Sequence, residues 1–403
     1  MANIIPHLYE IEDMVNFAKK HQHLYLYGCT GNQEALLKFF DICGINVDGF
    51  ITTWPDSREL HYRVIPKYTL DTVNLENAGI VVGLSDKYYD GVIPRLRERG
   101  FTDYFLMSEH NKHAIAYKLT PHPRERMWFE INLVDHCNLN CQMCDHFSHL
   151  ATPKFLNVDE FRRDMERLAE LSGNCMHAVK LQGGEPLMHK DINRFIEITR
   201  ELFPECEIRI FTNGLMLLKA EHYENGNFWQ CCVDNNADIL LTKYPINLDL
   251  ESIKKKASEY GASLEICVDV AELRYHNKDD ESDSSKTGNI KKSSKNPFDL
   301  KGSVEKHNFI GCYHLNWVAT LRHGKLYPCP IRAYAEYFNN AFNKNLKLSE
   351  EDCIDIYKAQ SYEELYSFVA SRIPFCRYCD IRGRRQVEWA QSKRELSEYV
   401  DEC

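Results

Sequence analysis

The sequence lacks both a long hydrophobic run and a basic tract. No segment approaches the ~20 apolar residues that a membrane span requires. Met1 through Lys20 mixes acidic residues with scattered apolar ones and does not form the apolar core of a signal peptide. No Lys/Arg run is flanked by stacking aromatics, and the formal net charge is −10, so nucleic acid is not an expected partner. We therefore expect a cytoplasmic protein without a membrane segment.

Cysteine, in contrast, is abundant, with 16 residues in a chain of 403. Without an export signal these thiols are not expected to form a disulfide framework, because the cytosol keeps them reduced. Nine of them, such as Cys29, Cys43 and Cys267, lack ligand spacing and are interpreted as small core residues, with Cys353 and Cys403 as spare thiols. The other seven form two groups whose spacing indicates metal ligation.

The chain divides into four predicted regions. Residues 1–120 are expected to form a Rossmann-like α/β domain around the turn Gly28-Cys29-Thr30-Gly31. This turn lacks the three-glycine dinucleotide pattern, so nucleotide or nucleotide-sugar binding and a structural or docking role both stay open. Residues 128–275 alternate strands and helices, which predicts an open, partial (β/α) barrel. Residues 276–307 are polar and Ser/Lys-rich and are expected to form a flexible linker before a Cys-bearing region at 308–403.

Local patterns place the elements within these regions. Asn157 and Glu160 predict a capping box at the start of a helix that ends before Gly173. Short apolar runs predict strands at 24–27, 50–51, 80–82 and 104–106 in the first region, and at 129–134, 179–181, 208–211, 239–241 and 264–268 in the barrel.

The first cysteine group, Cys137, Cys141 and Cys144, directly follows the first barrel strand with the spacing Cys-x3-Cys-x2-Cys. Three thiolates in one loop suit a cubane of four irons, because one iron stays open. That iron can chelate the amino and carboxylate groups of S-adenosylmethionine (SAM). A zinc site is the alternative, although zinc prefers four ligands in pairs and no fourth ligand lies in this segment.

With this motif the chain resembles the radical SAM superfamily. The resemblance implies a partial (β/α)6-type barrel, a SAM-binding [4Fe–4S] cluster and reductive cleavage of SAM to methionine and a 5′-deoxyadenosyl radical. The residue before the last cysteine is usually aromatic in the family and packs on adenine. Here it is Met143, whose thioether can also cover a ring face.

Two further motifs strengthen the resemblance. Gly183-Gly184-Glu185-Pro186 follows the second barrel strand and resembles the family's GGEP element, which implies that backbone groups and Glu185 hold the methionine ammonium. Thr212-Asn213-Gly214 follows the third strand and resembles the turn that contacts ribose or the methionine carboxylate. We expect both motifs beside the cysteine loop, because the carboxyl ends of parallel strands meet at one edge.

The second cysteine group is more dispersed. Cys312 and Cys329 flank an expected hairpin with Gly324 at its turn, and Cys376 and Cys379 add a Cys-x2-Cys pair. This region resembles the SPASM extension of radical SAM enzymes in its shortened, single-cluster twitch form. The resemblance implies one auxiliary [4Fe–4S] cluster, closed by four thiolates, that accepts an electron from a substrate radical. A zinc ribbon is the alternative.

The resulting expectation is an oxidoreductase that abstracts hydrogen from a small polar substrate and is reduced by a protein such as flavodoxin or ferredoxin. Twitch-bearing aminocyclitol dehydrogenases, and the Rossmann-like modules found in carbohydrate biosynthesis, favour a sugar, nucleotide sugar or aminocyclitol. A peptide-modifying SPASM-type maturase and a non-enzymatic iron–sulfur electron carrier remain alternatives. No proton-accepting residue is assigned. Tyr244, Asp269 and His314 are expected near strand ends without a role.

Overall fold

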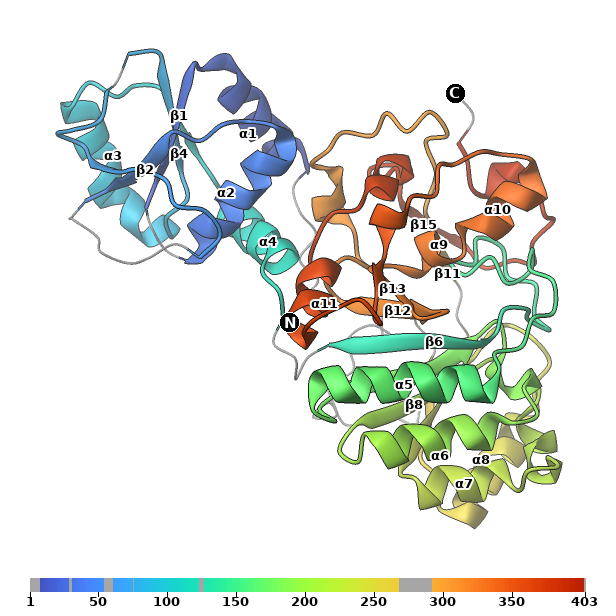
Figure 1. Cartoon of the computed structure of the whole chain (residues 1–403). Helices are drawn as coiled ribbons and strands as arrows, with labels where there is room; N and C mark the ends of the chain where they lie inside the picture. The colour runs from blue at the N-terminus through green and yellow to red at the C-terminus, as the bar shows by residue number, and fades with distance from the viewer. Residues whose placement is uncertain are drawn as a thin grey trace. The chain divides into compact units, whose positions relative to one another are not determined.

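The computed structural model of the chain describes residues 8–28, 31–53, 61–74, 76–122, 127–267 and 292–401. The chain forms two compact units, each built around its own sheet (Figure 1). The first comprises Met1–Pro121 and Glu305–Cys312, and the second His122–Val304 and Tyr313–Cys403. None of the helices in the described ranges is both long enough and apolar enough to cross a bilayer.

The first unit contains a five-stranded sheet of order β3-β2-β1-β4-β5, in which every pair is parallel. The strand order reverses between β1 and β4, as in a Rossmann-like fold, so this part of the predicted fold class is confirmed. Short runs of buried residues such as Ile80–Val82 explain the strands. The elements are α1 (Leu8–Lys20), β1 (His23–Tyr27), α2 (Gly31–Cys43), β2 (Gly49–Thr52), β3 (Lys67–Thr69), β4 (Ala78–Val82), α3 (Tyr89–Glu98), β5 (Tyr104–Leu106) and α4 (Glu109–Leu119).

The space around the carboxyl end of β1 is filled by neighbouring side chains of the protein. Gly28 has a φ of +107°, and a Cβ there would lie 2.6 Å from a Leu84 methyl and 2.8 Å from the Gln33 amide nitrogen. The buried Gln33 amide donates a hydrogen bond to the Gly83 carbonyl at 2.8 Å. Cys29 and Thr30, from the expected glycine-bearing turn, lie outside the described residues. Nucleotide binding by this unit therefore stays a hypothesis.

The second unit is built on an eight-stranded sheet of order β10-β9-β8-β7-β6-β12-β13-β14. Strands β6 to β10 are parallel and adjacent in sequence order, joined by α5 to α8, which confirms the predicted partial barrel. The barrel elements are β6 (Trp128–Val134), α5 (Val158–Ser172), β7 (Ala178–Gly183), α6 (Ile192–Leu202), β8 (Glu207–Thr212), α7 (Phe228–Asp234), β9 (Ala237–Thr242), α8 (Leu250–Tyr260) and β10 (Leu264–Cys267).

The C-terminal region contributes a sixth parallel strand to this sheet. β12 (Val318–Arg322) pairs with β6 on the side opposite to β7, in the register Val318↔Trp128. The expected hairpin is present, because β12 turns through His323 (φ +50°) and Gly324 (φ +68°) into β13. The sequence did not predict the pairing of β12 with β6. The remaining strands of this sheet are β13 (Lys325–Tyr327) and β14 (Ile354–Asp355).

The two faces of the barrel sheet differ in polarity. Phe129, Ile131 and Leu133 of β6 belong to the hydrophobic core that the helices cover, and α5 to α8 run along that side (Figure 1). Because side chains alternate along a strand, Glu130 and Asn132 face the other way. The Asn157 carboxamide caps α5 by accepting from the Asp159 and Glu160 amides, at 2.9 and 3.1 Å. The Asn157 cap is the first half of the expected capping box. The Glu160 carboxylate, which would form the second half, contacts His323 at 2.6 Å.

A second hydrophobic cluster joins the C-terminal region to Phe147 and Phe298 and includes Phe338, Phe375 and Tyr399. Most of the expected linker, residues 276–291, lies outside the described residues. The linker prediction is wrong for residues 292–295, because they pair antiparallel with a strand more than 80 residues later. The elements here are β11 (Lys292–Lys295), α9 (Pro330–Ala333), α10 (Ala335–Phe342), α11 (Tyr362–Val369) and β15 (Arg385–Glu388).

Candidate active site

The cysteine loop leaves the carboxyl end of β6 and is held there by the two glycines after β7. A Cβ at Gly184 would lie 2.1 Å from the His136 carbonyl oxygen and 2.5 Å from the Cys137 nitrogen. A Cβ at Gly183 would lie 2.4 Å from the Val134 carbonyl oxygen, which accepts the Gly184 N–H at 2.7 Å. Glycine is therefore required at both positions, because backbone passes directly against backbone.

Glu185 connects the two polar motifs. Its fully buried carboxylate accepts the Thr212 hydroxyl on Oε1 at 2.7 Å and the Asn213 N–H on Oε2 at 2.9 Å. The Leu187 N–H is a second donor to Oε1, at 3.1 Å. Burial raises the pKa of Glu185 to about 7, although these hydrogen bonds oppose the shift. Each oxygen can accept two hydrogen bonds, so Oε2 keeps room for one more donor.

The third motif also reaches the cysteine loop. The Asn213 side-chain nitrogen donates to the Asn138 carboxamide oxygen at 2.8 Å and lies 3.6 Å from the Cys137 sulfur. The Leu139 N–H points to the same sulfur at 3.3 Å. Gly214 has a φ of +82°, which lets the chain turn away after Asn213. The structure thus brings together the three segments that the sequence placed at one edge.

The three thiols of the loop influence one another electrostatically. Burial, followed by repulsion from neighbouring charges that include the other thiols, raises the pKa of Cys137. Burial and Cys144 raise the pKa of Cys141 to about 12. Burial opposes ionisation of Cys144 too, but hydrogen bonds from His146 and His149 outweigh it and lower that pKa to about 5. The loop therefore gathers three thiols, with two histidines placed to stabilise one of them as thiolate.

The donor set fits a cubane cluster. Within the described ranges, no group of three or more His, Cys, Asp and Glu side chains is arranged to hold a single metal ion. A cubane requires a different arrangement, because each thiolate binds a different iron.

Met143, in the same loop, has a φ of +55° and is 8% exposed. Pro186 begins a short 3₁₀ helix, Pro186–Met188, and is buried.

A segment near the C-terminus runs along the cysteine loop, which the sequence did not predict. The Gln142 N–H donates to the Ala390 carbonyl at 3.0 Å, and the Ser392 N–H donates to the Asn140 carbonyl at 2.7 Å. The Trp389 indole N–H points to the Cys141 sulfur at 3.3 Å. No local signal marks this pairing, because about 250 residues separate the partners.

Two of the residues left without a role also lie beside the loop. The Tyr244 ring packs against Trp389 at 5.6 Å between centroids. Asp145, directly after Cys144, accepts from Asn296 at 2.9 Å and contacts the Tyr313 hydroxyl and His314, the latter at 3.3 Å. Asp269 lies outside the described residues.

The non-helical face of the barrel sheet carries a buried polar layer. Glu130 accepts from Thr320 at 2.6 Å and from Gln182 at 2.8 Å, and lies 3.6 Å from His146. Burial raises the pKa of Glu130, but His146, Lys180 and Thr320 outweigh it and hold the pKa at about 2. Asn132 is 7% exposed, and neither amide atom has a hydrogen-bond partner in the described part of the chain.

Three of the four cysteines of the second group border the same hydrophobic cluster. Cys329, Cys376 and Cys379 all pack against the hydrophobic cluster around Phe338. Cys376 lies in the 3₁₀ helix Pro374–Tyr378, and its carbonyl accepts the Cys379 N–H at 3.2 Å. Cys312 belongs to the segment Glu305–Cys312 of the first unit. Whether Cys312 joins the other three stays a prediction.

The remaining cysteines fit the core interpretation only in part. It is wrong for Cys175, which is exposed, whereas Cys43 and Cys353 are partly buried. Cys29 and Cys403 lie outside the described residues. Those that are buried as expected are Cys206, Cys231, Cys232 and Cys267.

Comparisons with known proteins match part of the chain. Residues 131–225 match the radical SAM superfamily. GTP 3′,8-cyclase of Clostridium perfringens (strain SM101 / Type A) is 33% identical over 108 residues, which are 26% of this chain and 32% of that protein. GTP 3′,8-cyclase of Staphylococcus aureus (strain Mu3 / ATCC 700698) is 31% identical over 105 residues, 24% of this chain and 30% of that protein. The chain spans about a third of the length of these relatives.

Solved structures show a weaker similarity. BtrN, in complex with AdoMet and 2-DOIA, has a TM-score of 0.38 and 16% identity, covering 64% of this chain and 86% of BtrN. SuiB of Streptococcus suis has a TM-score of 0.28 and 15% identity, covering 46% of this chain and 44% of SuiB.

Proposed function

Because residues 131–225 form a radical SAM domain, we propose that this chain is an oxidoreductase that abstracts hydrogen from a small polar substrate. The domain implies SAM and a [4Fe–4S] cluster as cofactors. When bound, they supply a 5′-deoxyadenosyl radical. Cys137, Cys141 and Cys144 would hold the cluster at three of its irons, leaving the fourth for SAM.

The neighbouring motifs would hold SAM itself. Glu185 Oε2 has one acceptor position left, which suits an ammonium group. A cation there would draw the buried carboxyl into its charged form, because an opposite charge lowers the pKa that burial has raised. The Thr212-Asn213-Gly214 turn hydrogen-bonds Glu185, and Gly183-Gly184 directly precedes this glutamate, so these segments would contact the same ligand. Met143 would cover adenine.

The buried polar layer of the barrel supports a small polar substrate. Asn132 offers an amide oxygen and nitrogen that have no hydrogen-bond partner among the described residues, in register with Gln182 on β7. An unpaired buried amide costs about 1–3 kcal/mol, so a ligand with hydroxyl or amino groups is the natural complement. The Glu130 carboxylate, on the same face, adds an acceptor. This orphaned amide is the observation that carries the substrate class.

The second cysteine group supports a net oxidation. Cys329, Cys376 and Cys379, with Cys312 as the fourth ligand, would close an auxiliary [4Fe–4S] cluster with no open iron. Such a cluster would accept an electron from the substrate after hydrogen abstraction. A sugar, nucleotide sugar or aminocyclitol is the proposed substrate, and flavodoxin or ferredoxin the proposed reductant.

The function is tested with anaerobically reconstituted protein, dithionite and SAM. We expect 5′-deoxyadenosine to form, and a panel of sugars, nucleotide sugars, aminocyclitols and short peptides to reveal which class accelerates it. Deuterium placed on the substrate should appear in 5′-deoxyadenosine. The proposal fails if a variant lacking Cys137, Cys141 and Cys144 forms as much 5′-deoxyadenosine as the wild type. If only the peptides accelerated 5′-deoxyadenosine formation, the substrate would be a peptide and not a sugar, nucleotide sugar or aminocyclitol.

A matched pair of variants tests the role of Asn132. Asn132→Ala should raise KM for the stimulating substrate about tenfold or more, because a hydrogen-bonded polar contact is lost. Formation of 5′-deoxyadenosine from SAM alone should stay unchanged. Asn193→Ala makes the same change at a buried asparagine on the helical side of the sheet and should leave KM unaffected. Equal KM values in both variants would remove Asn132 from the substrate site.

A further inference from the structure

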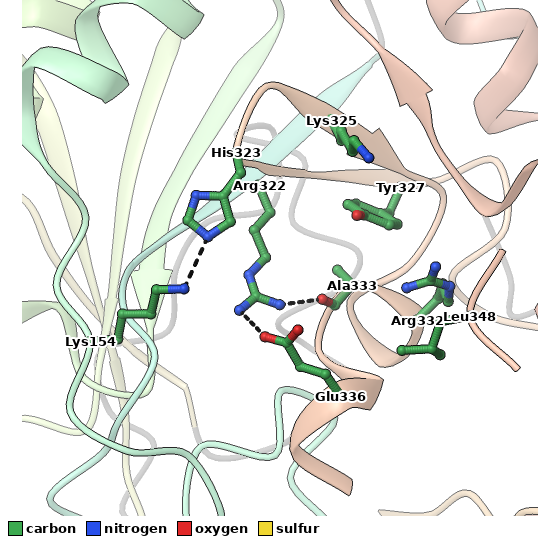
Figure 2. Close-up of a pocket in the computed structure, with 9 residues that line it drawn as sticks. All are labelled: Lys154, Arg322, His323, Lys325, Tyr327, Arg332, Ala333, Glu336 and Leu348. Atoms are coloured by element: carbon green, nitrogen blue, oxygen red, sulfur yellow. Dashed lines mark hydrogen bonds and ion pairs between the residues drawn. The ribbon is translucent and has the colours of Figure 1, made fainter. Parts of the chain in front are cut away.

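A cationic pocket opens at the carboxyl end of β12. Its volume is about 240 Å³, and Figure 2 shows side chains from several segments around it. Arg322, His323 and Lys325 come from the hairpin, Arg332 from α9 and Lys154 from the loop before α5. Glu336 is the single acidic residue that lines it.

The two arginines of the pocket are already compensated. Arg322 lies 2.7 Å from Glu336 and 3.2 Å from Asp135, so its charge faces two carboxylates. Arg332 pairs through Nε with the buried Asp352 at 2.7 Å, and its Nη2 donates to the Ser349 carbonyl at 2.9 Å. These contacts fix both guanidinium groups in the wall of the pocket.

The two lysines are not compensated. Lys154 Nζ lies 3.4 Å from His323 Nε2, and His323 Nδ1 contacts Glu160 at 2.6 Å, so the ammonium is positioned by an imidazole (Figure 2). Lys325 is opposite Asp355 in the β13–β14 ladder, but Asp355 pairs with Lys358 at 3.5 Å. No carboxylate in the described ranges pairs with Lys154 or Lys325.

The pocket shares its wall with the start of the cysteine loop. β12 runs parallel to β6, so both strands end at the same edge of the sheet. Asp135, two residues before Cys137, contacts Arg322 and donates its N–H to the Lys154 carbonyl at 3.0 Å. A group bound in the pocket would therefore lie at the edge where α/β sheets hold their ligands.

We propose that this pocket binds a phosphate group. Lys154 and Lys325 line the pocket from different segments, and neither ammonium has a carboxylate partner in the described ranges, so both can pair with a tetrahedral oxyanion. Whole-ligand pockets usually measure about 300–1,000 Å³, so this smaller pocket suits one charged group and not a complete nucleotide. The phosphate belongs either to the substrate, in which case the inference rests on the proposed function, or to a free phosphate.

The experiment uses the reconstituted holoprotein and three probes: inorganic phosphate, a sugar phosphate and a nucleoside diphosphate. Calorimetric titration should show binding that weakens as ionic strength rises. Lys154→Ala combined with Lys325→Ala should weaken it about tenfold or more. Lys190→Ala combined with Lys255→Ala removes the same charge from exposed positions outside the pocket and should leave the affinity unchanged.

The outcomes separate the source of the phosphate and the two proposals. If the sugar phosphate or the nucleoside diphosphate binds most tightly, the pocket belongs to the substrate site. If inorganic phosphate binds most tightly, the pocket is a site for a free anion. Equal affinities in the two double variants, or no binding of any probe, would overturn the inference. Formation of 5′-deoxyadenosine from SAM alone should persist in both double variants. If the wild type itself formed no 5′-deoxyadenosine, the proposed function would be refuted, whereas the phosphate-binding result would still hold.

Discussion

The two cysteine groups differ in how far apart along the chain their members lie. Cys137, Cys141 and Cys144 belong to one loop, and their pKa values already reflect one another. In the second group, Cys329 and the pair Cys376 and Cys379 lie on separate elements that pack against one hydrophobic cluster.

The difference shows where a short motif is sufficient. The first group is specified mainly by its own loop, because its spacing, the end of β6 and the glycines at 183 and 184 place it, and the segment around Trp389 packs against it. The second group depends on the hairpin, on α9 and on the 3₁₀ helix at Pro374–Tyr378. We therefore expect the first group to respond to changes in its own loop and the second to respond to changes in packing.

The largest expected effect is the loss of SAM cleavage in Cys141→Ala. Two thiolates cannot hold a cubane with one open iron, so 5′-deoxyadenosine formation should fall to background. Cys175→Ala, the same change at an exposed cysteine outside both groups, should keep full activity. Chromatographic detection of 5′-deoxyadenosine measures both. If Cys141→Ala retained activity, the first cysteine group would not be the site of SAM cleavage.

The second prediction concerns iron content. Cys376→Ala should lower the iron from about eight to about four per chain, because one of two cubanes is lost. 5′-Deoxyadenosine formation from SAM alone should remain. Iron and sulfide analysis, with zinc measured in the same samples, checks this. An unchanged iron content, or one zinc in the wild type, would show that the second group holds no auxiliary cubane.

Glu185→Gln should weaken SAM binding by about 10- to 100-fold, since a charge-assisted hydrogen bond is replaced by a neutral one. Because burial raises the pKa of Glu185 to about 7, the wild-type carboxyl gains its charge as pH rises through that value. SAM affinity should therefore increase from about pH 6 to 8 in the wild type and stay flat in the variant. Equilibrium measurements of SAM binding across this pH range test the prediction. A wild-type affinity that does not change with pH would contradict the role of Glu185 in binding the SAM ammonium.

Gly324→Ala should destabilise the hairpin that carries Cys329 by about 1–3 kcal/mol. A left-handed residue with a Cβ is strained, and this Cβ would lie 2.8 Å from the Tyr357 ring. Gly261→Ala, at a φ of +71° with no atom within 4 Å, should cost only about 1 kcal/mol. Thermal unfolding midpoints compare the two variants. Equal shifts would mean that packing at the hairpin contributes nothing beyond backbone strain.

The smallest effect is expected for Trp389→Phe. The indole N–H beside the Cys141 sulfur favours the more negative, reduced cluster, so its removal should lower the reduction potential while iron content is kept. Trp317→Phe changes a tryptophan that stacks on Trp128 and should not shift the potential. Potentiometric titration followed by EPR measures both. Identical potentials in the two variants would leave the C-terminal segment without influence on the first group.

Much of the fold could be predicted from the sequence because its signals are local. Apolar runs such as Phe129–Val134 coincide with observed strands, and Asn157 caps the helix that was expected to follow it. The Gly183-Gly184-Glu185-Pro186 and Thr212-Asn213-Gly214 motifs meet beside the cysteines because parallel strands end together. Their roles toward SAM stay predictions.

Long-range pairings could not be predicted. Val318–Arg322 reads as one strand of a hairpin, and nothing in its residues indicates that it also pairs with β6. The strand at Lys292–Lys295 was expected to be a loop because the segment is polar and rich in Ser and Lys, and its partner Arg385–Glu388 is distant in the chain. The contact of Trp389 with Cys141 likewise depends on tertiary structure.

The position of β12 has a consequence for biosynthesis. β6 is buried along its whole length, yet its partner on one side is translated only after about 180 further residues, which takes about 10–35 s at ribosomal rates. During that interval the nascent chain presents an unpaired, apolar strand edge, a known template for misassembly. The sheet is therefore completed on this side of β6 only when β12 has been synthesised, and until then the open edge is a point at which chaperones can act on the emerging polypeptide.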